Sequence, residues 1–307
     1  MKARRLSPLL AAKLGLLLLL VTTVAARAAN PALDAKAIGD AAGVKANVEA
    51  DGTVKINWSR DDVAVKVDGM PFPPAAGLGS WAAFTRMSGD TAMVMGDTVV
   101  FQDEVDAAMD AAFSHDLEVT ALHNHFFYDE PRVFFMHVGG EGDAVALAKD
   151  VKAVWDAIKA VRRTHPAPVE GFPGGTPKMG TLDAKRLSTT LGKPLTDNQG
   201  VLKMTVARQG RMHGSAIGGA MGLTTWAAFA GSEALASMDG DFIMTADEMQ
   251  PVMHALRGAG IHIVAVHNHM AGGEPQFFFL HFWGKGVADD LAKGLRSALD
   301  AQAKAGH

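Results

Sequence analysis

An internal duplication constrains the fold of this 307-residue chain more than any other feature of its sequence. The tripeptide His-Asn-His occurs at 123–125 and again at 267–269, and in both places Glu-Pro and a further histidine follow at the same spacing. Ten of the twenty residues at 123–142 are identical to their counterparts at 267–286. A sequence that recurs in this way indicates one structural unit built twice, so we expect two similar halves.

The duplication extends over most of the chain. Leu-Asp-Ala-Lys at 33–36 recurs at 182–185, and Trp-Ala-Ala-Phe at 81–84 recurs at 226–229. The residues between the two copies are rich in proline and glycine, which interrupt helices and strands alike. Each copy is long enough to bury a core of its own. The predicted organisation is a first repeat at 29–163, a linker at 164–181 and a second repeat at 182–307.

The first 28 residues have the pattern of a secretory signal peptide. Basic residues come first, an apolar run extends from Leu14 to Val24, and Ala26-Arg27-Ala28 supplies the small residues of a cleavage site. The apolar run is too short to span a bilayer comfortably, and the chain has no cysteine to which a lipid could be attached. We therefore predict a periplasmic or secreted protein that does not span the membrane after the signal peptide is removed.

Composition excludes several functional classes. Without cysteine the chain has no disulfides, no thiolate metal ligands and no cysteine nucleophile. Removal of residues 1–28 takes away five of the 29 basic residues and none of the 33 acidic ones, which leaves a formal charge of −9. No basic tract remains beyond the signal peptide, so nucleic acid is not an expected partner.

Strands are predicted wherever apolar and polar residues alternate. The segments 54–58 and 63–67 alternate in this way, and the four polar residues between them predict a hairpin. Gly96-Asp97 has the composition of a turn. Further strands are expected at 81–87 and 91–100.

Helices are predicted on both sides of the histidine motif, at 102–113 and 143–160, where apolar residues recur at helical spacing. In the second repeat the segment from Thr245 to Glu248 has the pattern of a capping box, which marks a helix N-terminus. The predicted fold class is α+β, with two homologous repeats, each an antiparallel sheet with two packed helices. A cupin-like β-barrel is the alternative, because His-x-His followed by a glutamate resembles the first motif of cupins.

The histidine motif predicts a site on one face of a hairpin. Side chains of a strand alternate between its two faces, so His123 and His125 lie on the same face. A loop that contains Glu130 leads to a second strand, and an antiparallel hairpin places His137 beside the first two histidines. The same argument applies to the second copy of the motif.

Three histidines and a carboxylate are a suitable ligand set for a divalent transition metal such as zinc, manganese, iron, nickel or copper. The glutamates are expected to act as fourth ligands or as general bases. The candidate ligands are His123, His125, Glu130 and His137 in the first repeat, and His267, His269, Glu274 and His281 in the second. In the alternative interpretation these groups bond only to one another and to the backbone.

Three functional classes are compatible with this site. The first is an exported protein that binds a transition metal through one or both repeats. The second is a metal-dependent hydrolase, in which a metal-bound water is the nucleophile and Glu130 or Glu274 the base. The third is a metal-free module that holds a small molecule or a cell-envelope ligand, such as a sugar or peptide, between aromatic residues. The sequence leaves the oligomeric state open.

The motifs resemble those of the LppY/LpqO family of secreted bacterial proteins and mycobacterial lipoproteins, a domain of unknown function. The resemblance rests on the Trp-Ala-Ala-Phe block, on Gly96-Asp97 and on Ala-Leu-His-Asn-His at 121–125, which is followed by Glu-Pro-Arg-Val-Phe-Phe-Met-His at 130–137. It covers nearly the whole chain after the signal peptide. It implies export but no reaction, and the lipid anchor of some members does not carry over to a chain without cysteine.

Overall fold

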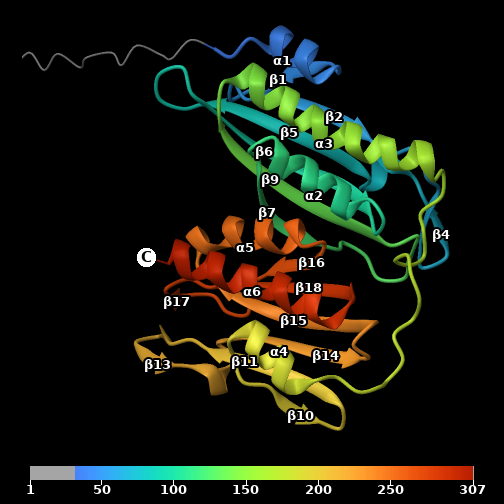
Figure 1. Ribbon diagram of the computed structural model, residues 1–307. Helices are drawn as coiled ribbons and strands as arrows, with labels where there is room; N and C mark the ends of the chain where they lie inside the picture. Colours follow the sequence, from blue (N-terminus) through green and yellow to red (C-terminus); the bar gives the residue numbers. More distant parts are fainter. Residues whose placement is uncertain (1–31, 307) are drawn as a thin grey trace, which may run out of the picture. The chain divides into compact units, whose positions relative to one another are not determined.

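Two halves with the same order of elements form the computed structural model, which describes residues 32–306 (Figure 1). The predicted signal peptide lies outside these residues. The first half contains α1 (Ala35–Ala42), β1 (Ala46–Val48), β2 (Val54–Ser59), β3 (Val65–Val67), β4 (Met70–Phe72), β5 (Gly79–Arg86), β6 (Ala92–Phe101), α2 (Val105–Ser114), β7 (Glu118–His123), β8 (Asp129–Glu130), β9 (Val133–Gly142) and α3 (Ala144–Thr164). The second contains α4 (Ala184–Leu191), β10 (Thr196–Asn198), β11 (Val201–Ala207), β12 (Gly210–Met212), β13 (Ser215–Ile217), β14 (Thr224–Gly231), β15 (Ala236–Met244), α5 (Ala246–Gly258), β16 (His262–His267), β17 (Gly273–Glu274), β18 (Phe278–Gly286) and α6 (Ala288–Ala305). A short 3-10 turn precedes β5 and β14. The predicted α+β fold with two repeats is confirmed.

The long strands of both halves join in a single twelve-stranded antiparallel sheet. Its order is β1-β2-β5-β6-β9-β7-β16-β18-β15-β14-β11-β10, and β7 meets β16 through the pair Leu122 and Val266. The sheet is open, because β1 and β10 stand at its two ends. The cupin-like barrel is therefore wrong. The histidine motifs lie in the four central strands or in the loops that follow them.

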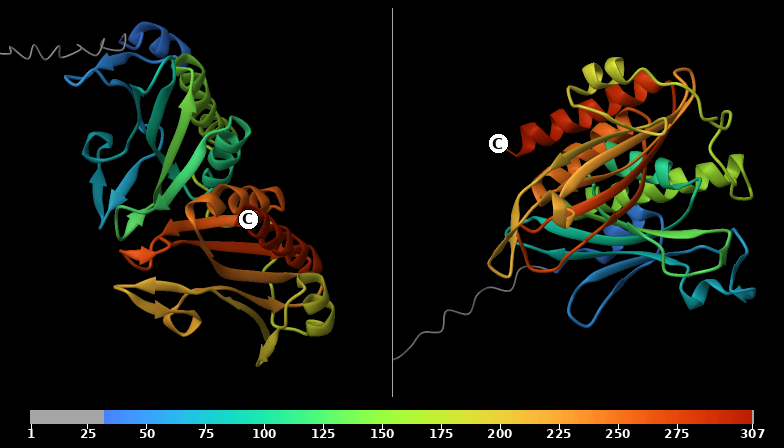
Figure 2. Two further views of the ribbon diagram at one scale, coloured as in Figure 1. Left: turned by 90° about the vertical axis from the view of Figure 1, so that its left-hand side faces the viewer. Right: turned by 90° about the horizontal axis from the view of Figure 1, so that it is seen from below.

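Helices cover one face of this sheet, as the left view of Figure 2 shows. Alternate residues of β9, such as Met136 and Val138, point into the main apolar core beneath α2 and α3. The residues between them point to the other face, where Phe135 joins a smaller apolar cluster under the three-stranded sheet β4-β3-β8. Within residues 32–306, no helix combines the length and the apolar character needed to cross a membrane.

The predicted hairpin at 54–67 is wrong. Strand β2 pairs with β1 and β5, whereas β3 pairs with β4 and β8. The reason is Arg60, whose side chain is fully buried and donates to both carboxylate oxygens of Glu104 at 2.8 Å and to the carbonyl of Val99 at 2.9 Å. A buried charge needs a partner, and this pairing draws Arg60 into the interior, whereas Ser59, Asp61 and Asp62 stay exposed.

The same ion pair recurs in the second repeat between Arg208 and Glu248. Glu248 also accepts a hydrogen bond of 2.9 Å from the backbone N–H of Thr245, as a capping box requires. The predicted helix start is thereby confirmed. In both halves an arginine just after a strand bonds to a glutamate at the start of a helix, with Glu104 as the N-cap of α2 and Glu248 in the first turn of α5.

The predicted turn at Gly96-Asp97 is also wrong, because β6 runs without a break from Ala92 to Phe101. A Cβ atom on Gly96 would lie 3.0 Å from Val138 Cγ2, and one on its counterpart Gly240 would overlap the ring of Phe282. The glycines therefore permit close packing of a neighbouring side chain rather than a change of chain direction.

We expect Gly240→Ala to destabilise the protein more than Gly96→Ala. The added methyl group at 240 would meet the Phe282 ring and lie 2.5 Å from the carbonyl oxygen of Trp226, and forced overpacking of this kind costs about 1–3 kcal/mol or more. At 96 the closest atoms are a methyl group of Val138 at 3.0 Å and the carbonyl oxygen of Trp81 at 3.1 Å, so smaller shifts are sufficient. Urea denaturation of both variants measures the difference, and equal midpoints would contradict it.

Candidate functional site

The histidines of the first repeat lie together on the face of the sheet opposite the long helices. His137 of β9 stands beside Ala121 of β7 on one side and Asp97 of β6 on the other. Its Nε2 atom is 3.0 Å from Nε2 of His123, and the ring centroid of His123 is 5.2 Å from that of His125. The structure thus brings together the three histidines that the hairpin argument placed on one face.

The second repeat has the same cluster in a slightly different arrangement. Here Nε2 of His269 is 3.1 Å from Nε2 of His267, and the rings of His267 and His281 are 4.9 Å apart. His281 of β18 stands opposite Asp241 of β15. In each repeat one pair of imidazole nitrogens therefore approaches to about hydrogen-bond distance.

An aspartate that sequence reasoning missed completes each cluster. Asp97 Oδ1 lies 3.9 Å from Nε2 of His137, and Asp241 Oδ2 lies 3.4 Å from Nε2 of His269. Both carboxylates are buried, and the Oδ1 atom of each has no hydrogen-bond partner within residues 32–306. Burial raises the pKa of Asp97 and of Asp241, against the opposing effect of the histidines. The available signal was the recurrence of Gly-Asp 144 residues later, the same interval as between the histidines.

The structure places the predicted glutamates elsewhere. Glu130 lies in β8 opposite Lys66, and it lines a hollow with Asp62 and the start of the linker. Glu274 lies in β17 opposite Arg211. In the described part of the chain, no hydrogen bond or ion pair joins either glutamate to the clustered histidines.

Aromatic rings hold the imidazoles in place. His125 stacks on Phe135 with a centroid distance of 3.4 Å and an interplanar angle of 7°, and His269 stacks on Phe279 at 3.4 Å and 10°. These contacts explain why a Phe-Phe pair accompanies the histidines in both repeats. His281 Nδ1 lies 3.3 Å from the carbonyl oxygen of Gly240. A donor bond from Nδ1 leaves Nε2 as the ring's lone-pair nitrogen.

The donor set suits a transition metal, although its present geometry does not close around one. Two nitrogens that each bind one ion at about 2.1 Å lie about 3.0 Å apart when the N–metal–N angle is about 90°, and about 3.4 Å apart when it is tetrahedral. The observed Nε2–Nε2 distances of 3.0 and 3.1 Å fall within this range. Burial lowers the pKa of His125 and of His267, and the neutral imidazole is the form that binds metal. As the side chains of residues 32–306 stand, no group of three or more of them is positioned to hold an ion.

A hollow of about 400 Å³ opens beside the first cluster. Its lining includes Asp97, His125, Trp58 and Phe135. Near this cluster the ring of Phe126 packs against Phe72 at 4.8 Å, whereas the second repeat has a methionine at the position of Phe126. The surroundings of the two clusters therefore differ although their histidines correspond.

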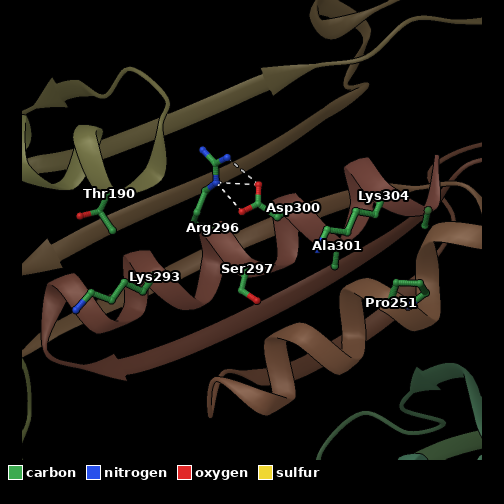
Figure 3. A pocket seen from close by; sticks show the side chains of 9 residues that line it. Thr190, Pro251, Lys293, Arg296, Ser297, Asp300, Ala301 and Lys304 are labelled. Carbon is green, nitrogen blue, oxygen red and sulfur yellow. Dashed lines mark hydrogen bonds and ion pairs between the residues drawn. The ribbon is translucent and has the colours of Figure 1, made fainter. Parts of the chain in front are cut away.

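A separate hollow of about 660 Å³ lies between α4, α5 and α6 (Figure 3). Two of its three basic residues are compensated, since Arg296 bonds to Asp300 (Figure 3) and Lys293 lies 2.9 Å from Asp289. It contains no residue of the histidine clusters.

Comparison with known proteins supplies a family but no activity. No curated protein matches the chain. Among solved structures it has a low similarity to the trimeric bacterial microcompartment shell protein PduB, with 9% identity and a TM-score of 0.20 over 82% of this chain and 88% of that chain. It has a comparable similarity to EtuB from Clostridium kluyveri, with 10% identity and a TM-score of 0.21 over 84% and 90% of the two chains. TM-scores this low carry no argument.

The sequence profile of one family matches the chain twice. The matched segments are residues 36–157 and 185–301, which together make up more than half of the chain. Each segment contains one complete histidine cluster and its aspartate. The chain therefore belongs to the family described as Domain of Unknown Function (DUF1259), with one copy of the domain in each repeat.

Proposed function

We propose that each repeat binds one divalent transition-metal ion. The proposed ligands are His123, His125, His137 and Asp97 in the first repeat, and His267, His269, His281 and Asp241 in the second. One observation carries the proposal: the same three imidazoles and the same buried carboxylate, with one oxygen unpartnered, occur in both repeats. Zinc, manganese, iron, nickel and copper all accept such a set.

A metal-free cluster explains the site less completely. A single N–H···N bond accounts for the nitrogen pair of each repeat. It leaves Asp97 Oδ1 and Asp241 Oδ1 without a partner, and an unsatisfied buried polar atom costs about 1–3 kcal/mol, more when charged. A cation at the centre of the cluster would satisfy these oxygens. The remaining ligands would reach it through side-chain rotation. The ring of His125 stacks on Phe135, and that of His269 stacks on Phe279 and already lies 3.1 Å from Nε2 of His267.

We place this metal-binding protein in the bacterial periplasm or outside the cell. The support is the signal-peptide pattern of residues 1–28 and the resemblance of the motifs to the LppY/LpqO family. The cysteine-free composition is compatible with either location. Binding or delivery of a metal at the cell envelope is the function that these properties favour.

Hydrolysis is the second candidate, and the hollow beside Asp97 and His125 favours it. A bound transition metal would supply an activated water there. The hollow would admit a substrate to the first cluster. The base would be a second water, because Asp97 is a proposed ligand and Glu130 lines a different hollow.

We expect the untagged protein, purified from the periplasm, to contain two equivalents of metal per chain. His123→Ala and His267→Ala should each lose one equivalent and retain the other, because the two clusters share no ligand. Elemental analysis measures the content, and circular dichroism confirms that each variant is folded. If the wild type contains no metal and its melting temperature does not change with any of the five metals, the proposal is wrong and the metal-free module is favoured.

A further inference from the structure

The two repeats meet at strand residues that are each other's counterparts. Leu122 of β7 pairs with Val266 of β16, and the two positions are 144 residues apart, as are the histidine motifs. Positions across this junction therefore correspond in pairs. Val119 corresponds to Ile263, and Asp106 of α2 to Gln250 of α5. A contact that one repeat makes at this junction can therefore be compared with the equivalent position in the other repeat, where it is sometimes missing.

On one side of the junction, the side chain of Gln250 completes the edge of β7. Its Nε2 donates to the carbonyl oxygen of Val119 at 2.9 Å, and its Oε1 accepts from the backbone N–H of Val119 at 3.2 Å. One carboxamide thus satisfies both main-chain groups of this residue, as a neighbouring strand would.

On the other side, Asp106 makes no such contact. A carboxylate can only accept hydrogen bonds, so it cannot bond to a carbonyl oxygen. Its oxygens instead lie 2.5 Å from Nδ1 of His262 and 2.8 Å from Nη1 of Arg257. In the described part of the chain, no side chain bonds to the backbone of Ile263.

A hollow of about 500 Å³ lies where the missing carboxamide would be. Both Asp106 and Ile263 line it, together with the aromatic side chains of Phe134, Phe172 and Trp283. Phe172 belongs to the linker between the repeats and stacks on His262 with a centroid distance of 3.7 Å. The hollow therefore combines an incompletely paired strand edge with an aromatic wall, which is the usual composition of a small-molecule site.

We propose that this hollow binds a carboxamide that bears an apolar or aromatic substituent. The amide would pair with the backbone of Ile263 as Gln250 pairs with Val119. The substituent would lie against Phe134, Phe172 and Trp283. A free small amide and the amide of a short peptide share this chemistry. The proposed contacts are made by the strand edge, α2 and the linker. Because His281, a proposed metal ligand, also lines the hollow, binding is measured both with and without a chelator.

The first test compares two probes that share the aromatic ring and the carbonyl group and differ in the donor, the ester having a methoxy group in place of the amide NH2. 3-Phenylpropionamide carries the carboxamide of a glutamine side chain and an aromatic ring, whereas methyl 3-phenylpropionate has no N–H group. Isothermal titration of the full chain, with and without a chelator, should show saturable binding of the amide. Loss of one hydrogen bond predicts about tenfold weaker binding of the ester. Equal binding of the two probes, or no binding of either at millimolar concentration, would overturn the proposal.

The second test exchanges a residue between the repeats. Asp106→Gln places at 106 the glutamine that the second repeat has at 250. Its carboxamide should pair with the backbone of Ile263 and weaken binding of the amide probe at least about tenfold. Asp110→Asn is the matched control, because Asp110 is the other carboxylate on Arg257 and does not line the hollow. Phe172→Ala, which removes only an aromatic wall, should weaken both probes. Unchanged amide affinity in folded Asp106→Gln and Phe172→Ala would exclude this site.

Discussion

Glu104→Gln is expected to lower the free energy of unfolding by about 3 kcal/mol or more. Glu104 and Arg60 are both fully buried, and the carboxylate also accepts a hydrogen bond of 2.8 Å from the backbone N–H of Phe101. The amide keeps the shape of the side chain but leaves the guanidinium without its buried counter-charge. Asp62, which is one-third exposed, remains as the only acidic partner of Arg60 within residues 32–306. Urea denaturation should show a lower midpoint with an unchanged slope.

The duplicated chain supplies a matched control for this prediction. Glu248→Gln removes the equivalent carboxylate, but its partner Arg208 is 29% exposed and can be solvated by water. Gln302 also donates to Glu248 at 2.9 Å. We expect a loss of about 1–2 kcal/mol at this position. Equal effects of the two substitutions would show that burial of the arginine does not determine the cost.

The local pattern of apolar and polar residues was sufficient to predict the α+β class and the two repeats. Alternation identifies strands, helical spacing identifies helices, and both depend on neighbouring residues only. The histidine hairpin belongs in part to this class, since the pairing of β7 with β9 brings His123 beside His137. His125, expected on the strand, lies in the loop after β7 and joins the cluster from there. The capping box at Thr245 was predicted for the same reason.

Local sequence pattern does not predict which strands far apart in the sequence pair with one another. Asp97 joins the histidines because β6 pairs with β9 in one register, and nothing in the sequence around Gly96 specifies that register. The same limit explains the hairpin error, because burial of Arg60 depends on a glutamate 44 residues later. The union of the two repeats in one sheet depends on a single strand junction, at Leu122 and Val266.

The effect of Asp97→Asn on the stability of the protein should change sign when metal is added. Without metal, the substitution removes a buried charge whose Oδ1 has no hydrogen-bond partner, so the variant should be as stable as the wild type or more stable. With metal, the wild type should be stabilised by binding, whereas the variant has lost a charged ligand. Even changes beside a metal ligand cost about 10–100-fold in affinity, and we expect a loss of about 100-fold or more at the first site.

Glu130→Gln is the control that separates this site from the one predicted by sequence alone. Glu130 lies in β8 and has no bond to the histidines within residues 32–306, so its substitution should leave metal affinity and metal-dependent stability unchanged. Melting temperatures of both variants, measured with a chelator and with each metal, give all the required comparisons. If Glu130→Gln abolishes binding at the first site and Asp97→Asn does not, the glutamate is the ligand and the β8 loop must move toward His125 when metal binds. If only Asp97→Asn abolishes it, the carboxylate comes from β6, and all ligands of the first site except His125 stand on the paired strands β6, β7 and β9.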